Sequence, residues 1–316
     1  MSEDMIFSIH NAVLSNLDRL SELHGVLTEQ RLLELCDIAH PMAEASISLL
    51  DDGLDGYEML LAISENLTFG EYPISNDNTA DNIDYVKKSI DMLGRVDKAF
   101  LTEIYTRFMA DKGRPITEND FLPTSTGVET FTYVRNSLSD EAYDVVSQEF
   151  EDPKVRYSAS FKDCARAVAD GEVTYCLLPL EERGGVRLPT VSDIIFRNDF
   201  KINSVIPVFG PDGNADMKYA LVSKNFTASE RDSDDDGYLE IRLGADSALS
   251  EILWAVDYFG MSIYRVNTAT FDTEGENETY FSVVIKDGGC SFTPILTYFT
   301  LFIRDFIPVG IYKNLE

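Results

Sequence analysis

The sequence predicts an α+β protein of several domains, and three observations support this. Apolar residues follow a helical period up to about residue 112, segments that read alternately as strand and helix come next, and a β-α-β-β-α-β order follows the acidic tract 230–236. The chain has 316 residues, more than the roughly 100–150 of one domain. We therefore expect an all-α domain over residues 1–122, an α/β domain over 129–228 and a third domain over 229–316.

The N-terminal part shows apolar side chains at every third or fourth position, which is the period of an amphipathic helix. The clearest run extends from Ile83 to Ile104 and predicts one continuous helix. Thr79 offers a cap near its start, and Gly113 ends it. The turn-forming residues 51–53 predict a break between earlier helices.

The central part alternates between β-rich and helical segments. Strands are predicted over residues 130–134, 154–157 and 174–180, with helices over 140–150 and 161–169. The last of these strands is almost continuously apolar, which is typical of parallel strands with helices on both faces. Beyond the acidic tract, the sequence predicts a strand at 238–243, a helix at 247–258, strands at 261–271 and 278–285, a helix at 292–302 and a strand at 306–312. That order is the ferredoxin-like β-α-β-β-α-β unit.

Charge and composition exclude several classes of function. The 26 Lys and Arg against 55 Asp and Glu give a formal net charge of −29, so the average surface repels phosphate. We expect neither nucleic acid nor an anionic membrane as a partner. No cationic leader and no stretch of about 18 apolar residues is visible, so we expect a cytoplasmic protein. The four cysteines are scattered, which favours reduced thiols.

The catalytic and cofactor-binding motifs that can be searched for are mostly missing from the sequence. It has no Walker loop, no GxGxxG after a strand, no HExxH and no GxSxG. The three histidines, His10, His24 and His40, are too far apart to share one helix face. The tract Asp232 to Gly237 imitates the start of a calcium loop, but Leu243 stands where a bidentate Glu is needed. We therefore expect no metal and no cofactor.

One candidate anion site lies in the central part, at Asn136-Ser137-Leu138-Ser139. These residues stand between the end of a strand and the start of a helix, where free N–H groups and the helix dipole attract an anion. Asn136, Ser137 and Ser139 are thus candidates for binding a substrate carboxylate. The alternative is that Ser139 only caps the helix.

The central residues also resemble a known family. Ser160-Phe161-Lys162-Asp163, Gly171 and the run from Tyr175 to Glu181 are similar to the prephenate dehydratase domain, whose fold has two periplasmic-binding-protein-like lobes. The family's strand ends in Pro-Ile-Glu-Asn-Ser, and Pro179-Leu180-Glu181-Glu182-Arg183 stands in its place. The resemblance implies Glu181 and Lys218 as catalytic residues and Arg183 as a substrate-binding residue.

The sequence departs from that family in two respects. The family's Thr-Arg-Phe triplet is replaced by Met217-Lys218-Tyr219, which loses the hydroxyl and keeps a charge without the bidentate fork of arginine. In addition, only the thirty-one residues 186–216 separate Gly185 from this triplet. They are too few for a second α/β lobe, so we expect only half of a periplasmic-binding-protein-like domain.

The last segment carries Ala248-Leu249, Gly260, Tyr280-Phe281 and Val309-Gly310-Ile311-Tyr312. With these residues at the landmark positions, Tyr238 to Tyr312 resembles the ACT domain that regulates these enzymes. The resemblance implies pairing into a homodimer or higher homo-oligomer, with an effector site that includes Ser247, Ala248, Leu249 and Asn267. Asn267-Thr268-Ala269-Thr270 replaces the family's Glu-Ser-Arg-Pro, so an effector's amino group loses its carboxylate partner.

The N-terminal helices stand where bifunctional relatives carry a chorismate mutase. The mutase grips a dianion with several basic side chains, and the basic residues available here are Arg19, Arg31, Lys87, Lys88, Arg95, Lys98 and Arg107. Their spacing does not match the family's, and Met42 stands where a basic residue is expected. An interaction or dimerisation domain is the alternative.

Three hypotheses about function follow. In the first, the chain is a divergent prephenate-dehydratase-like protein of phenylalanine metabolism that binds a small amino acid or a prephenate-like dianion, with lost or altered catalysis. In the second, it is an active dehydratase that converts prephenate to phenylpyruvate, CO2 and water, in which Glu181, Arg183 and Lys218 bind and protonate the substrate. In the third, it is a structural oligomer without a small ligand.

Overall fold

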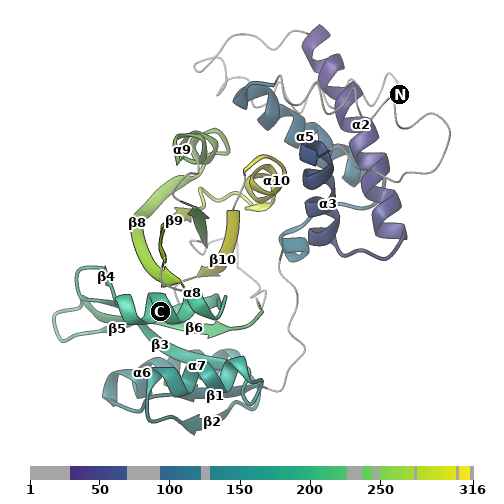
Figure 1. Ribbon diagram of the computed structural model, residues 1–316. Helices are drawn as coiled ribbons and strands as arrows, with labels where there is room; N and C mark the ends of the chain where they lie inside the picture. Colours follow the sequence, from purple (N-terminus) through teal and green to yellow (C-terminus); the bar gives the residue numbers. More distant parts are fainter. Residues whose placement is uncertain are drawn as a thin grey trace. The chain divides into compact units, whose positions relative to one another are not determined.

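The computed structural model describes residues 29–69, 93–121, 129–225, 237–244, 249–273, 276–303 and 306–313. The chain forms two compact units (Figure 1). Unit 1 comprises Met1–Phe121 with Phe292–Arg304, and unit 2 comprises Leu122–Ser291 with Asp305–Glu316.

Unit 1 is helical in its described residues. Its elements are α2 (Glu29–Asp51), α3 (Gly56–Phe69), α5 (Arg95–Asp111), the 3-10 helix η1 (Glu118–Phe121) and α10 (Thr293–Phe302). Helix α2 packs against α3 and α5, and α10 packs against the same two helices. The predicted break after α2 is confirmed, because the turn at Gly53 takes a φ of +100°, which suits glycine.

The continuous helix predicted from Ile83 to Ile104 is wrong at Gly94. Helix α5 begins at Arg95, and Gly94 precedes it as an extended N-cap with φ −70° and ψ 165°. Glycine is a poor interior helix residue, because it loses the most backbone freedom there, so it acts as a boundary. The predicted end is confirmed, since α5 stops at Asp111 and Gly113 has a φ of +75°. Residues 83–92 lie outside the described residues.

Unit 2 is built on one mixed sheet. Its strands are β1 (Thr130–Tyr133), β2 (Lys154–Tyr157), β3 (Tyr175–Glu182), β4 (Val186–Arg187), β5 (Lys201–Phe209), β6 (Ala215–Ser223), β7 (Gly237–Gly244), β8 (Ser262–Thr273), β9 (Glu276–Lys286) and β10 (Phe306–Lys313). The order across the sheet is β2-β1-β3-β6-β5-β10-β7-β9-β8, with β4 paired to β3. The described helices of this unit are α6 (Ser137–Val146), α7 (Phe161–Ala169), α8 (Pro189–Arg197) and α9 (Leu249–Tyr258).

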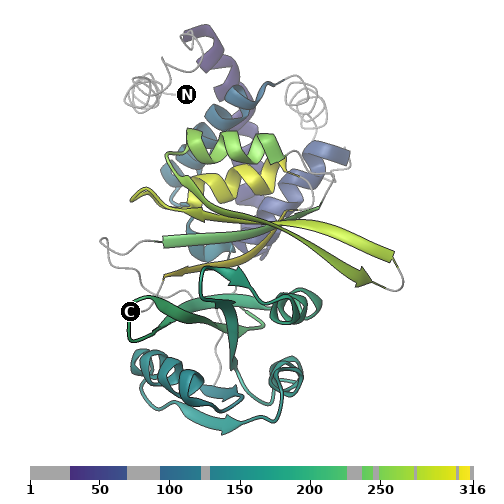
Figure 2. The same ribbon diagram turned by 90° about the vertical axis from the view of Figure 1, so that its left-hand side faces the viewer.

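The predicted parallel strands of the central part are confirmed, because β1 pairs in parallel with both β2 and β3. Strand β3 is apolar on both faces for a clear reason. Cys176 and Leu178 pack in the core that α7 and α8 cover, while Tyr175 and Leu177 pack in the core of α6 on the other face (Figure 2). The predicted start of α6 at residue 140 is wrong by three residues, because Asn136 caps the helix.

The predicted β-α-β-β-α-β element order is confirmed for β7, α9, β8, β9, α10 and β10. Its strands lie in the order β10-β7-β9-β8, and every neighbouring pair is antiparallel. The second helix of this series, α10, belongs to unit 1. The boundaries of the three domains expected from the sequence stay a prediction.

Residues 186–216 contribute to this same sheet and not to a separate lobe. They form β4, α8, β5 and the start of β6. Strand β5 then pairs in parallel with β10, where Gly310 lies opposite Ile202. This one pairing joins the central strands to the C-terminal ones, so unit 2 has a continuous sheet.

We expect Gly310→Ala to weaken that junction. A Cβ at residue 310 would lie 2.6 Å from the carbonyl oxygen of Ile202, so β10 would have to move away from β5. The expected loss of unfolding free energy is about 1–3 kcal/mol. Trp254, the single tryptophan, lies in α9, so its fluorescence in a urea titration reports on unit 2. Ser137→Ala is the control, because this residue of α6 lies in the same unit and its side chain is exposed. An equal loss for both variants would contradict the explanation.

Candidate functional site

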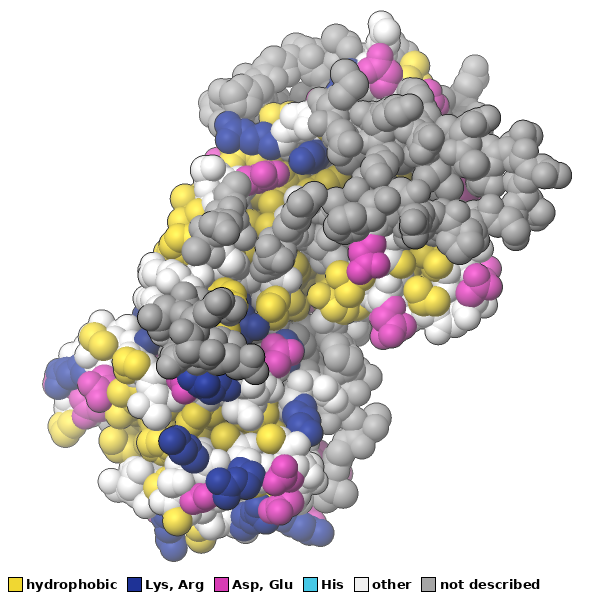
Figure 3. Space-filling view, in the orientation of Figure 1, with side chains coloured by type: hydrophobic (Ala, Val, Ile, Leu, Met, Phe, Trp, Pro, Cys, Tyr) yellow, Lys and Arg dark blue, Asp and Glu magenta, His cyan; other side chains and the backbone are white. Residues whose placement is uncertain are grey.

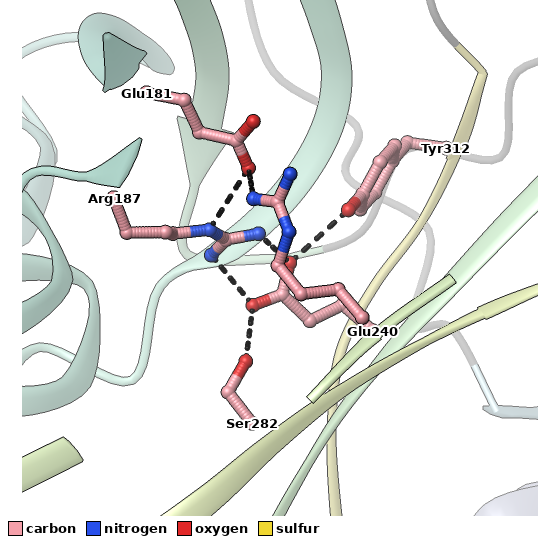
Figure 4. Close-up of polar contacts among 6 residues, drawn as sticks. Glu181, Arg187, Glu240, Ser282 and Tyr312 are labelled. Atoms are coloured by element: carbon pink, nitrogen blue, oxygen red, sulfur yellow. Dashed lines mark hydrogen bonds and ion pairs between the residues drawn. The ribbon is translucent and has the colours of Figure 1, made fainter. Parts of the chain in front are cut away.

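A buried cluster of charged side chains lies where the central and C-terminal strands of unit 2 meet. Arg187 of β4 donates from Nη1 and Nη2 to the two carboxylate oxygens of Glu240 on β7, at 2.8 and 2.7 Å. Its Nε donates to Glu181 of β3 at 3.2 Å. Ser282 and Tyr312 also donate to Glu240, at 3.0 and 3.1 Å (Figure 4). Each oxygen of Glu240 thus accepts two hydrogen bonds.

Arg265 of β8 completes this cluster, and its Nη1 donates to Oε1 of Glu181. Its approach depends on Gly185, because a Cβ at that position would lie 2.8 Å from Nη2 of Arg265. We call Glu181, Arg187, Glu240 and Arg265 the ion cluster. The Oε2 atom of Glu181 is buried and has no hydrogen-bond partner among the described residues.

The ion cluster shifts the titration of its members. Burial raises the pKa of Glu240, but Arg187 and the hydrogen bonds from Ser282 and Tyr312 outweigh burial and hold that pKa below its ordinary value. Burial, together with the charge of Glu240, raises the pKa of the Tyr312 hydroxyl well above its ordinary value. Burial opposes the charge of Arg187, yet Glu240 raises its pKa overall. At neutral pH the Arg187–Glu240 pair is therefore fully charged.

A cavity of about 750 Å³ lies beside the ion cluster. Helix α8 and strands β7, β8 and β9 supply most of its walls. The lining residues are Gly185, Val186, Arg187, Pro189, Ser192, Asp193, Ile195, Phe196, Glu240, Arg242, Asn267, Thr268, Thr270, Tyr280, Ser282 and Val309. Its volume falls in the range of roughly 300–1,000 Å³ that is usual for small-molecule sites.

Arg242 of β7 is the second arginine that lines this cavity, which we call the Arg242 cavity; the first, Arg187, is paired with Glu240 and Glu181. The guanidinium carbon of Arg242 lies 4.3 Å from the ring centre of Phe196 and 5.6 Å from that of Tyr280. The Nε atom is buried and has no hydrogen-bond partner among the described residues. Asp199 comes only within 4.0 Å of Nη2. Burial lowers the pKa of Arg242, against the opposite effects of Asp199 and Tyr280. Its charge is thus only partly compensated.

Asn267 provides a second unsatisfied donor in the Arg242 cavity. Its Nδ2 is buried and has no hydrogen-bond partner among the described residues. Leaving a buried donor unpaired costs about 1–3 kcal/mol, so Arg242 and Asn267 are the residues of the cavity lining that we consider candidates for holding an acceptor. Of the four residues predicted to bind an effector, Asn267 is the one that lines this cavity. Leu249 begins α9, and Ser247 and Ala248 lie outside the described residues.

The predicted catalytic pair lies on adjacent strands. Glu181 of β3 is opposite Lys218 of β6, and the side chain of Glu181 is 5% exposed. The Nζ of Lys218 lies 5.9 Å from the ring centre of Tyr264. Glu181 contacts Arg187 and Arg265, and neither Glu181 nor Lys218 lines the Arg242 cavity. The predicted substrate-binding Arg183 is exposed and pairs with Asp212 and Asp216.

The candidate anion site at the start of α6 is occupied by a capping box. The Oδ1 of Asn136 accepts from the backbone N–H groups of Leu138 and Ser139, both at 3.0 Å. The Oγ of Ser139 accepts from the N–H of Asn136 at 2.8 Å. Asn136 is therefore the cap and Ser139 its reciprocal partner. Ser137 is exposed in the first turn.

We expect Asn136→Ala to lower the unfolding free energy of unit 2 by about 1 kcal/mol, because it removes the acceptor of two backbone N–H groups. A urea titration followed by Trp254 fluorescence measures the change. Ser137→Ala, in the same turn, should have a much smaller effect. Equal effects of the two substitutions would show that the capping box contributes little.

In unit 1, the described basic residues of the long helices make contacts within the unit. Arg31 donates to Asp97 and to Glu34, each at 2.7 Å. Met42, which stands where the mutase resemblance expects a basic residue, is buried in the helical core. Within the described residues, no group of three or more His, Cys, Asp and Glu side chains is arranged to hold a metal ion.

The face of unit 2 that Figure 3 shows carries mixed charge, although the whole chain is acidic. Figure 3 shows Lys and Arg side chains interspersed with acidic and apolar ones over the part of the molecule that holds α6 and α7. Ion pairs in this unit include Arg135 with Asp140 and Arg156 with Glu172. None of the helices in the described part of the chain has the length and apolar character that crossing a membrane requires.

Comparison with known proteins finds similarity among solved structures. No protein-family model matches the chain, and no curated protein matches it. Prephenate dehydratase from Streptococcus mutans is similar with a TM-score of 0.47 and 13% identity, covering 60% of this chain and 100% of that one. The prephenate dehydratase from Arthrobacter aurescens in complex with L-Phe has a TM-score of 0.43 and 13% identity, covering 58% of this chain and 89% of that one. GqqA, described as a quorum-quenching acylase, has a TM-score of 0.43 and 16% identity, covering 59% of this chain and 96% of that one.

The residues around the Arg242 cavity were mostly not predicted from the sequence. Glu240 and Arg242 alternate with Leu239, Ile241 and Leu243 in β7, and charged residues in an otherwise apolar strand are a usable signal. Their partners are not recognisable in the sequence, because Arg187 lies 53 positions before Glu240. Only the strand order brings them together.

Proposed function

We propose that this chain is a prephenate-dehydratase-like protein that binds a small organic carboxylate in the Arg242 cavity. On this proposal it works as a binding or regulatory protein of aromatic amino-acid metabolism, with lost or altered catalysis. The metabolic context rests on the sequence resemblance. The observation that carries the binding proposal is that Arg242 and Asn267 line one cavity, and that Nε of the first and Nδ2 of the second are buried donors without a hydrogen-bond partner among the described residues.

The cavity offers both parts of a recognition site for such a ligand. A guanidinium binds a carboxylate through charge-assisted hydrogen bonds, which are about twice as strong as neutral ones. Ile195, Phe196 and Val309 provide apolar surface for the rest of the molecule. Arg187 is not available for this role, because Glu240 and Glu181 accept from its Nη and Nε groups.

The surroundings of Glu181 support loss or alteration of the dehydratase reaction. Its Oε1 accepts from Arg187 and Arg265, so that oxygen is engaged within the protein. The neighbouring strand offers Met217 and Lys218 in place of the family's hydroxyl and guanidinium. We expect purified protein to form no phenylpyruvate from prephenate above the spontaneous rate. Turnover that Glu181→Gln abolishes would overturn this part of the proposal and favour an active dehydratase.

Calorimetric titration of the full chain with small carboxylates tests the binding proposal. The series should include aromatic and branched aliphatic amino acids, their 2-oxo and 2-hydroxy analogues, and prephenate. We expect at least one of them to bind with a stoichiometry of one per chain. Arg183→Gln is the matched control for substitutions of Arg242, because it removes an exposed arginine that does not line the cavity. Absence of binding across the series would overturn the proposal.

We further propose that the chain forms a homodimer or higher homo-oligomer through its C-terminal strands. Strand β8 ends the sheet, so one of its edges has no neighbouring strand in the described chain. It also exposes Tyr264 and Val266, which are 46% and 40% exposed. Light scattering of eluting protein measures the mass. A monomeric mass at micromolar concentration would contradict this proposal. An oligomer whose mass is the same in Val266→Lys would contradict the assignment to this strand edge.

A further inference from the structure

We infer that the outer edge of strand β2 binds an extended segment of another protein in which acidic and apolar residues alternate. This inference goes beyond the proposed function, because no residue of β2 lines the Arg242 cavity. It follows from the place of β2 in the sheet, from the exposure of its side chains and from the different chemistry of its two faces.

Strand β2 ends the sheet of unit 2, and β1 is the one described strand that pairs with it (Figure 1). The N–H groups of Lys154 and Ser158 donate to carbonyl oxygens at the β1 side. Because successive backbone groups of a strand alternate between its two edges, the N–H and C=O groups of Val155 and Tyr157 face outward. An edge of this kind can pair with a further strand.

The side chains of β2 are uncovered on both faces, since all four of its residues are exposed. Parallel strands normally have helices over both faces. Helix α6 covers the core that contains Phe131 and Tyr133 of β1, and α7 contacts β1 and β3. The uncovered strand therefore offers its side chains, as well as its backbone, to a partner.

The α6 side of β2 is apolar and aromatic. Val155 and Tyr157 lie beside Phe131 and Tyr133 in the ladder, and the rings of Tyr133 and Tyr157 meet edge to face at 5.3 Å. The guanidinium carbon of Arg135 lies 4.8 Å from the ring centre of Tyr157. Even so, Val155 and Tyr157 remain 37% and 51% exposed. Apolar side chains of an added strand would remove this area from water, which favours binding.

The α7 side of β2 is basic. Lys154 and Arg156 alternate with Val155 and Tyr157, so their side chains project to the opposite face. Arg156 pairs with Glu172 at 2.6 Å, but both side chains are exposed, and such a pair contributes little. Acidic side chains of an added strand can pair with both cations. Each such cross-strand pair contributes roughly 0.2–1 kcal/mol.

A second copy of β2 is disfavoured as the partner. Side chains directly opposite each other on neighbouring antiparallel strands lie on the same face, so self-pairing places Lys154 opposite Arg156 or Arg156 opposite itself. Like charges in these positions destabilise the pairing. The basic side chains thus act against association of identical edges and favour an acidic strand.

The charge of the whole chain does not prevent binding of an acidic segment. The net charge is −29, and it repels acidic molecules at long range. At physiological salt, exposed charges more than about 8 Å apart are largely screened. Lys154 and Arg156 would lie well within this distance of an adjacent strand, so their attraction dominates at contact.

The test uses a synthetic peptide, Glu-Ile-Glu-Val-Glu-Ile with blocked ends, and a counterpart in which Lys replaces each Glu. In an NMR titration of the isotope-labelled full chain, we expect the acidic peptide to bind at least about tenfold more tightly than the basic one. The largest shifts should occur at the amides of Val155 and Tyr157, which face outward. Equal binding of the two peptides, or binding of neither, would overturn the inference.

Reversing the charge of the edge makes the test sharper. We expect the double variant Lys154→Glu with Arg156→Glu to prefer the basic peptide. Arg183→Glu with Arg197→Glu changes the net charge equally elsewhere in unit 2, and this control should still prefer the acidic peptide. Trp254 fluorescence in urea verifies that both variants are folded.

Two outcomes of these experiments would contradict the inference. A folded charge-reversed variant that still prefers the acidic peptide would show that Lys154 and Arg156 do not select the partner. Slow hydrogen exchange at the amides of Val155 and Tyr157 before any peptide is added would show that a second copy, or another part of this chain, already covers the edge.

Discussion

Replacing Glu240 by alanine is expected to destabilise unit 2 by about 3 kcal/mol or more. The substitution leaves the guanidinium of Arg187 buried with Glu181 as its remaining acidic partner, and removes the acceptor of Ser282 and Tyr312. An uncompensated buried charge costs more than the intact pair contributes, so the loss is larger than for a surface pair. Urea unfolding followed by Trp254 fluorescence measures the difference from the unsubstituted protein.

Arg183→Ala is the matched control for Glu240→Ala. Arg183 also pairs with two acids in unit 2, but its side chain is 57% exposed, so water can replace these partners. Its removal should leave the unfolding free energy nearly unchanged. A small effect of Glu240→Ala, comparable to that of Arg183→Ala, would mean that the Arg187–Glu240 pair contributes little to the stability of unit 2.

The same carboxylate predicts a pH dependence of stability. The pKa of Glu240 in the folded protein lies below its ordinary value of 4.5, so the unfolded chain binds the proton more readily. The stabilisation is therefore fully present above pH 4.5 and is lost as the pH falls through the lower, folded pKa. In Glu240→Gln this contribution is absent, and the stability of the variant should fall less steeply below pH 4.5. Parallel curves for the two proteins would contradict the assignment.

Replacing Arg242 by glutamine is expected to weaken binding of the cavity's carboxylate ligand by roughly 10- to 100-fold, because a hydrogen bond to a charged group contributes about 1.5–3 kcal/mol. Arg242→Lys keeps the charge but loses the planar fork and the stacking on Phe196. Its affinity for the ligand should therefore lie between that of the unsubstituted protein and that of Arg242→Gln. Calorimetric titration with the tightest ligand of the series measures all three.

The Arg242 variants need a control for indirect effects, because the guanidinium also packs on the rings of Phe196 and Tyr280. Urea unfolding shows whether each variant retains the fold of unit 2. Arg183→Gln should bind the ligand with unchanged affinity. If Arg242→Gln is folded and binds the ligand as the unsubstituted protein does, the carboxylate is held elsewhere and the Arg242 cavity is not its site.

Local patterns in the sequence determined much of the secondary structure. The β-α-β-β-α-β order and helix α7 follow from apolar periodicity and from caps such as Ser160, which involve neighbours within a few residues. The almost continuous apolar run of β3 was also sufficient to predict parallel strands with helices on both faces. The error at Gly94 has the same local origin, because apolar spacing continues across a residue whose backbone does not favour the helix.

What the sequence by itself determined, then, is which segments are helices and strands, since that depends on residues close together in the chain. The tertiary structure alone decided which charged side chains meet. Arg187 reaches Glu240 across 53 positions, and Arg265 reaches Glu181 across 84. These pairs exist because the β10–β5 pairing places the central and C-terminal strands in one sheet. The donors of Arg242 and Asn267 that find no partner in the described part of the chain likewise result from burial, which only the folded chain produces.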